Sequence, residues 1–281
     1  MILYFAFAVI LFLTLGILCS LRLKVTEYEV PISGVQGEVR IVFLSDLHCR
    51  AHHLRFGKDY ERIVCTVEAQ EPDLIVIPGD LINRNSTEID DKAAGRLIRD
   101  LTRIAPVYFS YGNHEREYLA DGWSMLTNVV EAYGGHILEC AYEDMCINGT
   151  RFRLGGMSER AYKGGDGKFD PTAEAFLTEF CDTPIPKVLL SHRPEAIFFN
   201  YGCSEWDVDL VLSGHTHGGM LRLPFVGGLV APNQGLFPNV DRGEYEFFGT
   251  KMLVTSGIAG YNGIPRIYNP SEICVVTLKS E

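Results

Sequence analysis

Residues 208–217, VDLVLSGHTH, join a short apolar run to a polar tip. The run has the length and composition of a buried β-strand, and it ends at His215 and His217, which are one residue apart. Glycines at positions 214, 218 and 219 flank the two imidazoles and leave room beside them for ions and a substrate. We therefore predict a strand whose carboxyl end presents two histidines, each to a different metal ion.

The same construction recurs at four other places along the chain. The apolar runs RIVFLSDLH, LIVIPGD, VYFSYGNHE and KVLLSH end at Asp46 and His48, at Asp80, at Asn113 and His114, and at His192. Between the first three runs, apolar residues recur at helical spacing within residues 60–67 and 93–101. Alternating strands and helices predict a layered α/β fold, in which sites form at the carboxyl ends of strands. We expect the shorter runs RFRLGG, KMLVTSG and EICVVTL to be antiparallel strands.

The residue types at these strand ends indicate a metal centre. Carboxylates, one amide and several imidazoles form a mixed oxygen and nitrogen set, which suits two divalent transition ions such as Mn, Fe, Zn or Ni. Taken singly, Asp46 or Asp80 could equally cap a helix, and His192 could be a capping or packing residue. The joint arrangement of all five tips favours metal binding over these readings.

The five blocks resemble the pattern of the calcineurin-like metallophosphoesterase superfamily, which reads Asp-x-His, Gly-Asp, Gly-Asn-His-Glu, a lone His and Gly-His-x-His. They occur here in that order within residues 45–219. The resemblance implies a layered αββα sandwich with a dinuclear site. It implies one ion held by Asp46, His48 and His217, a second ion held by Asn113, His192 and His215, and Asp80 as the bridge between them.

The resemblance also implies a mechanism. A hydroxide that bridges the two ions, with manganese the favoured metal, would attack phosphorus directly, and His114 would protonate or stabilise the departing alkoxide. In the Ser/Thr phosphatase branch, an Asp three residues after the bridging Asp orients this histidine, whereas this chain has Asn83 there. Arg84 and Arg193 adjoin the proposed ligands, and they could bind a phosphate or form surface ion pairs.

The chain starts with a long apolar segment. Residues 1–21 contain no charged side chain and would span about 30 Å as a helix, which is the thickness of a bilayer core. The segment lacks the basic start and the small-residue cleavage site of a signal peptide. We predict a transmembrane anchor at 1–21, a linker and leading strand at 22–38, and the catalytic domain at 39–281. Arg22 and Lys24 follow the anchor, and the cysteines are scattered, which favours a single-pass protein with a cytoplasmic-facing catalytic domain.

Composition narrows the function classes. The formal net charge is −11 and no Lys/Arg-rich run occurs, which disfavours nucleic acid as a partner. The apolar start and residues 253–278 also look like the membrane-attached bacterial branch of the superfamily. We expect a phosphodiester, pyrophosphate or monoester substrate, possibly a lipid-linked nucleotide sugar such as UDP-2,3-diacylglucosamine. Residues 218–238 could contact acyl chains or cover a sheet edge. The alternatives are a non-catalytic metal-binding interaction module on the same fold, and a nuclease.

Overall fold

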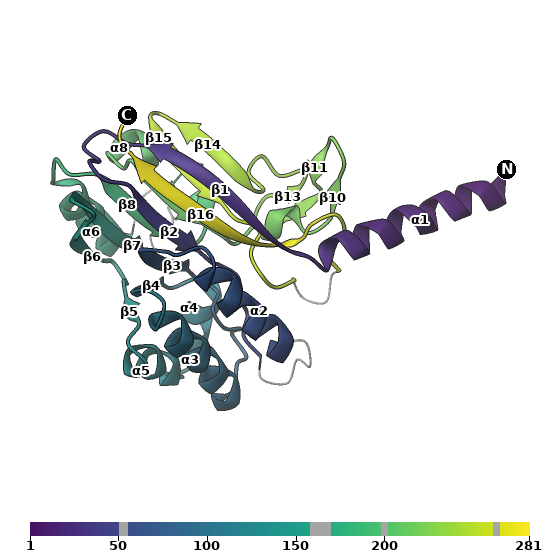
Figure 1. The fold of residues 1–281 in the computed structure, drawn as a ribbon, viewed down its shortest axis with the longest axis horizontal. Coiled ribbons are helices and arrows are strands. Elements are labelled where there is room, and N and C mark those ends of the chain that lie inside the picture. The colour runs from purple at the N-terminus through teal and green to yellow at the C-terminus, as the bar shows by residue number, and fades with distance from the viewer. Residues whose placement is uncertain (51–55, 158–169, 198–201, 261–264) are drawn as a thin grey trace.

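The computed structural model describes residues 1–50, 56–157, 170–197, 202–260 and 265–281. Within these ranges the chain forms two six-stranded sheets, two small hairpins, helices that cover the outer faces of the sheets, and one N-terminal helix that projects away from them (Figure 1). The helices are α1 (Ile2–Ser20), α2 (Phe56–Glu68), α3 (Glu88–Thr102), α4 (Asn113–Ala120), α5 (Met125–Ala132), α6 (Pro171–Cys181), α7 (Pro194–Ile197) and α8 (Gly202–Glu205), with a 3-10 turn η2 (His217–Gly219).

The first sheet has the strand order β1-β16-β2-β3-β4-β5. Its strands are β1 (Leu23–Pro31), β16 (Ser271–Lys279), β2 (Val39–Phe43), β3 (Leu74–Pro78), β4 (Val107–Ser110) and β5 (His136–Ile137). The strands β2 to β5 run parallel, because helices connect them over one face. The strand β1, which lies in the segment predicted as linker and leading strand, pairs with β16 along its whole length.

The second sheet has the strand order β14-β15-β9-β8-β7-β6. Its strands are β14 (Gly243–Phe247), β15 (Thr250–Val254), β9 (Leu210–Ser213), β8 (Lys187–Ser191), β7 (Thr150–Met157) and β6 (Ala141–Ile147). Two hairpins extend from the loop after β9. They are formed by β10 (Arg222–Leu223) with β11 (Gly227–Gly228), and by β12 (Val230–Ala231) with β13 (Gly235–Leu236).

The direction of three strands differs in part from the prediction. The strands β7, β15 and β16 were expected to be antiparallel, and each does have one antiparallel neighbour. Each also pairs with a parallel neighbour on its other side. The residue pattern of a short strand reports its buried face but not its direction, because direction depends on how the chain returns to the sheet.

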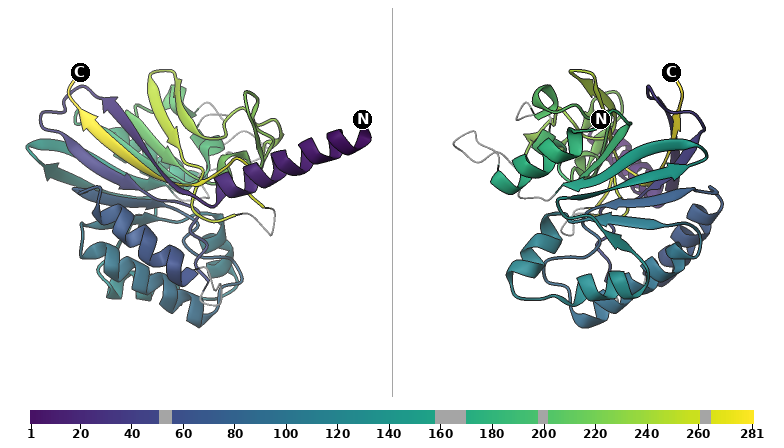
Figure 2. Two further views of the ribbon diagram at one scale, coloured as in Figure 1. Left: turned by 45° about the vertical axis from the view of Figure 1, so that its right-hand side comes forward. Right: turned by 90° about the vertical axis from the view of Figure 1, so that its left-hand side faces the viewer.

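Apolar side chains alternate between the two faces of each sheet and define the layers. In the first sheet, Val42 packs toward the helices, whereas its neighbour Ile41 packs toward the second sheet. In the second sheet, Leu212 faces the first sheet and Val211 packs with residues of α6. Burying each such side chain stabilises the fold by roughly 1.5–3 kcal/mol. The result is the αββα sandwich that the sequence predicts (Figure 2).

The helix α1 projects from the sandwich (Figure 1). Its window Leu3–Ser20 has a mean hydropathy of 2.4 with 6% of its residues buried, so its length and composition would allow it to cross a membrane. Its C-terminal half contacts the segment before β16. The Tyr268 N–H donates to Gly16 O and the Tyr268 hydroxyl donates to Phe12 O, both at 3.0 Å. Gly16 allows this approach, because a Cβ there would lie 2.5 Å from Ile267 Cγ2.

Candidate metal centre

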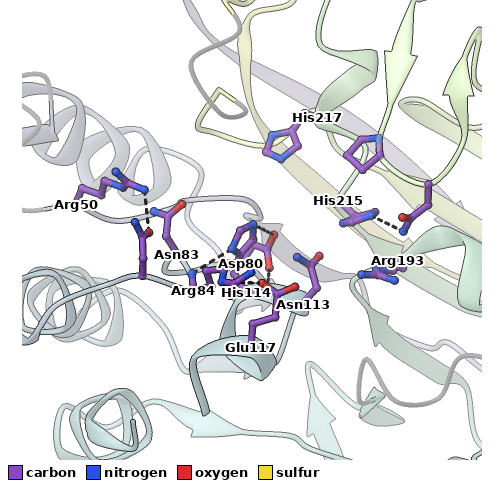
Figure 3. A pocket seen from close by; sticks show the side chains of 13 residues that line it. Arg50, Asp80, Asn83, Arg84, Asn113, His114, Glu117, Arg193, His215 and His217 are labelled. Carbon is purple, nitrogen blue, oxygen red and sulfur yellow. Dashed lines mark hydrogen bonds and ion pairs between the residues drawn. The ribbon is translucent and has the colours of Figure 1, made fainter. Parts of the chain in front are cut away.

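The polar tips of both sheets meet at one end of the sandwich. The residues that follow β2, β3, β8 and β9 lie within ligand distance of one another, so the carboxyl ends of these strands are at the same end of the stacked sheets. Figure 3 shows labelled side chains from these loops around one pocket. The seven predicted ligands all lie directly after these strands. They are Asp46 and His48 after β2, Asp80 after β3, Asn113 after β4, His192 after β8, and His215 and His217 after β9. The structure therefore brings together residues from two different sheets.

Most of these side chains are carried by left-handed backbone. Asp46, His48, Asp80, His215 and His217 have φ values between 44° and 68°. This region is uncommon for residues other than glycine and costs roughly 1–3 kcal/mol each. Backbone bonds hold the loops in place: His48 N–H donates to Asp80 O at 3.0 Å, and His215 N–H donates to the Asp46 carboxylate at 3.1 Å. Strain of this kind is typical of functional sites.

The glycines of the motifs allow close packing, a role that comes in addition to the predicted one of leaving room for ions and substrate. A Cβ at Gly214 would lie 2.0 Å from Ser45 Oγ and 2.5 Å from Asp46 Oδ2. A Cβ at Gly218 would lie 2.6 Å from Asn269 Oδ1, and one at Gly219 would lie 2.4 Å from Gly228 Cα. The glycines thus let neighbouring loops approach the ligand loops closely.

Asp46, His48 and His217 form the first cluster. Their candidate ligand atoms lie within 4.8 Å of one another, and His217 Nε2 is 3.5 Å from Asp46 Oδ1. The rings of His48 and His217 stack with their centroids 5.3 Å apart. One carboxylate with two imidazoles is a suitable ligand set for a divalent transition ion.

Asp80, His192 and His215 form the second cluster, again with candidate ligand atoms within 4.8 Å of one another. His192 Nε2 lies 3.2 Å from Asp80 Oδ2, and His48 Nε2 of the first cluster lies 3.7 Å from the same oxygen. The Asp80 carboxylate therefore lies between the two clusters. The family resemblance implies the role of bridging ligand for Asp80.

Some buried polar atoms of this site have no hydrogen-bond partner among the described residues. They include both ring nitrogens of His48 and Oδ1 of Asn113. Buried polar atoms are normally paired, and leaving one unpaired costs roughly 1–3 kcal/mol. Imidazole nitrogens and amide oxygens are ligands for divalent transition ions. The donor set and these unpaired atoms together fit two divalent ions.

The electrostatics of the site also suit cations. Burial lowers the pKa of His48, lowers the pKa of His217 to about 4, and lowers the pKa of His215 well below its ordinary value. Burial opposes ionisation of Asp80, but His192 and His48 outweigh it and hold the pKa of Asp80 well below its usual range. An ionised Asp80 needs positive charge nearby, but burial disfavours the protonated form of these imidazoles. A bound cation would supply that charge, and the neutral imidazoles would coordinate the cation through their ring-nitrogen lone pairs.

Glu115 links the loops after β3 and β4. Its carboxylate accepts hydrogen bonds from the N–H groups of Asp80 at 2.9 Å, Ile82 at 3.0 Å and Gly112 at 2.8 Å. Burial and the nearby charge of Asp80 raise the pKa of Glu115 to about 7. The side chain thereby fixes the backbone of Asp80 relative to the start of α4.

His114 lies beside this loop with a defined tautomer. Its Nδ1 accepts a hydrogen bond from the Arg84 N–H at 3.1 Å, so its proton is on Nε2. Nε2 lies 3.9 Å from Asp80 Oδ2 at the cavity (Figure 3). Asn83, which stands where the related branch has an orienting Asp, donates instead to His48 O at 3.3 Å. A backbone amide therefore orients His114 in this chain.

The site opens into a cavity of about 530 Å³. Both predicted substrate-binding arginines line it, and Arg84 also lies 3.6 Å from the exposed Glu117 carboxylate. In Figure 3, Arg50 and Arg193 lie on opposite sides of Asp80. The cavity thus combines the acidic and imidazole clusters with guanidinium groups at its edge, an arrangement that can bind a phosphate oxygen.

Sequence reasoning missed Arg50 and Asn233, which also line the cavity. The Asn233 Nδ2 lies 3.0 Å from His215 Nε2. Asn233 occupies the turn between β12 and β13, and nothing in its local sequence indicates which strand end it faces. Its position within residues 218–238, which directly follow the Gly-His-x-His block, was the only available signal.

Comparison with protein families and curated proteins gives consistent results. Residues 39–219 match the family described as calcineurin-like phosphoesterase. An uncharacterized metallophosphoesterase of Bacillus subtilis is 28% identical over 92% of this chain and 86% of the relative. The phosphodiesterase YaeI of Escherichia coli is 28% identical over 69% of this chain and 66% of the relative. A Danio rerio protein named "Transmembrane protein with metallophosphoesterase domain" is 30% identical over 91% of this chain, which spans 57% of that relative.

The fold also resembles a solved structure. The sulfate thiohydrolase SoxB of Thermus thermophilus superposes with a TM-score of 0.50 at 13% identity, over 89% of this chain and 58% of that chain. At this level of identity the likeness concerns the fold alone.

Proposed function

This chain belongs to the calcineurin-like phosphoesterase family, and we propose that its clustered ligands hold two divalent ions at a site of phosphoester hydrolysis. Membership of this family makes the chain a metal-dependent phosphoester hydrolase. In our assignment, Asp46, His48 and His217 hold one ion; Asn113, His192 and His215 hold the other; and Asp80 contacts both. We propose manganese as the preferred ion.

The observation that carries this proposal is the position of one carboxylate. Oδ2 of Asp80 lies 3.2 Å from His192 Nε2 and 3.7 Å from His48 Nε2, although these histidines come from different sheets. Two cations held close together repel each other unless an anionic oxygen lies between them. The low pKa of Asp80 keeps that oxygen anionic.

The chemistry divides between the bound ions and the chain. When bound, two divalent ions would supply positive charge to polarise the phosphoryl oxygens and to acidify water for direct attack on phosphorus. The Nε2–H of His114 donates a hydrogen bond that stabilises the departing alkoxide, which then takes its proton from water; the imidazole keeps its own proton, since Arg84 N–H occupies Nδ1. Arg193 and Arg84, at the cavity edge, bind oxygens of the phosphate group. In the proposed reaction, no side chain forms a covalent intermediate with the substrate.

We propose a phosphodiester or pyrophosphate substrate, with an apolar group attached. The cavity volume of about 530 Å³ suits a phosphate-bearing headgroup. The E. coli relative named as a phosphodiesterase supports a diester. The apolar helix α1 supports a membrane location, and we propose it as a single-pass anchor with the domain at residues 39–281 facing the cytoplasm. A lipid-linked nucleotide sugar such as UDP-2,3-diacylglucosamine fits this description.

Hydrolysis of bis-(p-nitrophenyl) phosphate by the full chain in detergent tests the proposal. We expect turnover that EDTA abolishes and Mn²⁺ restores. Asp80→Asn should lower kcat/KM by more than the roughly 10–100-fold that loss of an outer-shell partner costs. The exposed Asp121 on the surface provides a matched control, Asp121→Asn, which should retain wild-type turnover. Turnover that survives EDTA, or an Asp80→Asn variant as active as the control, would contradict the proposal.

A further inference from the structure

The two hairpins after β9 present apolar side chains to solvent. Phe225 and Val226, at the turn of the first hairpin, are 110% and 58% exposed, and Leu236 and Phe237, in the second, are 72% and 64% exposed. We call these four residues the hairpin surface. Residues 223–240 contain no Asp, Glu, Lys or Arg. An exposed apolar surface of this kind marks an interaction site.

The hairpin surface is continuous with α1. Tyr268 is bonded to Phe12 O and Gly16 O of α1, and its neighbour Ile267 accepts a hydrogen bond from Arg222 N–H of β10 at 3.0 Å. The views agree that the hairpins lie beside the base of α1 (Figures 1 and 2). The contact with Tyr268 begins eight residues before the end of α1, about 12 Å along its axis. A membrane that holds α1 therefore reaches the level of the hairpins.

The same hairpins are fixed to the proposed metal site. Pro232 and Asn233, in the turn of the second hairpin, line the cavity, and Asn233 contacts His215. Leu229 N–H, between the hairpins, donates to Gly219 O at 3.2 Å, next to the turn that carries His217. One side of the hairpins therefore contacts the site while the hairpin surface points to solvent.

Charge favours a bilayer over another occupant. With a net charge of −11, most of the chain is repelled by an anionic membrane surface and by a second copy of itself. The uncharged hairpin surface can approach anionic headgroups without that repulsion. Aromatic side chains such as Phe225, Phe237 and Tyr268 suit the boundary between headgroups and acyl chains.

We propose that the hairpin surface inserts into the same bilayer that holds α1 and thereby places the cavity at the membrane surface. A phosphate ester could then enter the site with its apolar part still in the bilayer. This inference rests on the proposed function for the identity of the substrate, but the membrane contact itself does not depend on catalysis.

Tryptophan fluorescence of the full chain in phospholipid vesicles tests the contact. Phe225→Trp and Phe237→Trp each place a reporter on a different hairpin, so one remains informative if the other variant fails to fold. Phe248→Trp is the matched control, because Phe248 is also well exposed, at 70%, but lies away from the site. It precedes the start of β15, and it is the opposite end of β15 that pairs with Ser213 beside the site. The wild-type chain, with its two tryptophans, gives the background emission. The vesicles contain phosphatidylcholine and phosphatidylglycerol with acyl chains brominated near the headgroup.

We expect the brominated lipid to quench the added emission at positions 225 and 237 at least about twofold more than at position 248. Circular dichroism melting curves check that each variant is folded. Equal quenching at the three positions, or emission at 225 and 237 that is shielded from lipid by a second copy, would overturn the inference. Because the measurement is lipid contact, its failure would leave the EDTA and Mn²⁺ test of hydrolysis untouched.

Discussion

At the scale of single residues, the sequence indicates which side chains end the strands but not why glycines precede two of them. The positions of the candidate ligands after strands were predictable, because each follows an apolar run in the sequence. The reason for the glycines was not, because it lies in loops distant along the chain. A Cβ at Gly79 would lie 2.6 Å from His192 Nδ1, and one at Gly112 would lie 2.3 Å from Asp80 Oδ1. The Gly-Asp and Gly-Asn pairs are thus also requirements of packing.

The orientation of His114 is a further residue-scale feature that the sequence hides. The substitution of Asn83 for an orienting Asp put the role of His114 in question, and a backbone amide is invisible to any residue pattern. In the structure, Arg84 N–H supplies the hydrogen bond to Nδ1. Any residue at position 84 other than proline could supply the same bond.

The role of His114 as hydrogen-bond donor to the departing oxygen predicts a dependence on the leaving group. His114→Ala should lower kcat by roughly 10²–10³-fold for a diester with an alkyl leaving group, because that group departs as a strongly basic alkoxide. The loss should be much smaller for p-nitrophenyl esters, whose leaving group departs as a stable anion. His136→Ala, at an exposed histidine on β5, serves as the control. Equal losses on both substrates would rule out stabilisation of the leaving group by His114.

At the scale of elements, apolar periodicity predicted the helices α2 and α3 and the strands that carry the site. It failed for the hairpins, because strands of two residues are too short to show any period. It also could not give the direction of β7, β15 and β16. Direction is set by connections, and part of the connection after β7, residues 158–169, lies outside the described residues.

The strands β6 and β7 and the helix α6 are joined by one guanidinium group. Arg153 donates to the Asp144 carboxylate at 2.6 and 3.0 Å, and also to Glu179 O at 3.0 Å. The hydrogen bond from Arg153 lowers the pKa of Asp144. A carboxylate with a lowered folded-state pKa stabilises the fold above its unfolded pKa and loses this effect as the pH falls through its folded pKa.

We therefore expect Asp144→Asn to lower the free energy of unfolding at neutral pH by about 0.5–1 kcal/mol, a small value because the pair is partly exposed. The difference from wild type should shrink below about pH 4. Thermal melting as a function of pH measures it, with Glu246→Gln, an exposed carboxylate on β14, as the control. A difference that stays constant with pH would show that the ion pair is not its cause.

At the scale of the whole molecule, the site exists only because two sheets stack. The sequence predicts polar tips at five strands, and the family resemblance predicts their grouping, but apolar patterns alone do not say which tips face each other. The structure places Asp46, His48, Asp80 and Asn113 after strands of one sheet, and His192, His215 and His217 after strands of the second. The position of α1 beside the hairpins is likewise a property of the assembled fold, set by contacts of Tyr268.

The central claim is that loops from both sheets hold two cations around Asp80. A crystal structure of the full chain grown with Mn²⁺, with anomalous differences recorded at the manganese edge, tests it most directly. We predict two anomalous peaks, one contacting Asp46, His48 and His217, the other contacting Asn113, His192 and His215, and both contacting Asp80. The absence of peaks, or peaks that do not contact Asp80, would contradict the account.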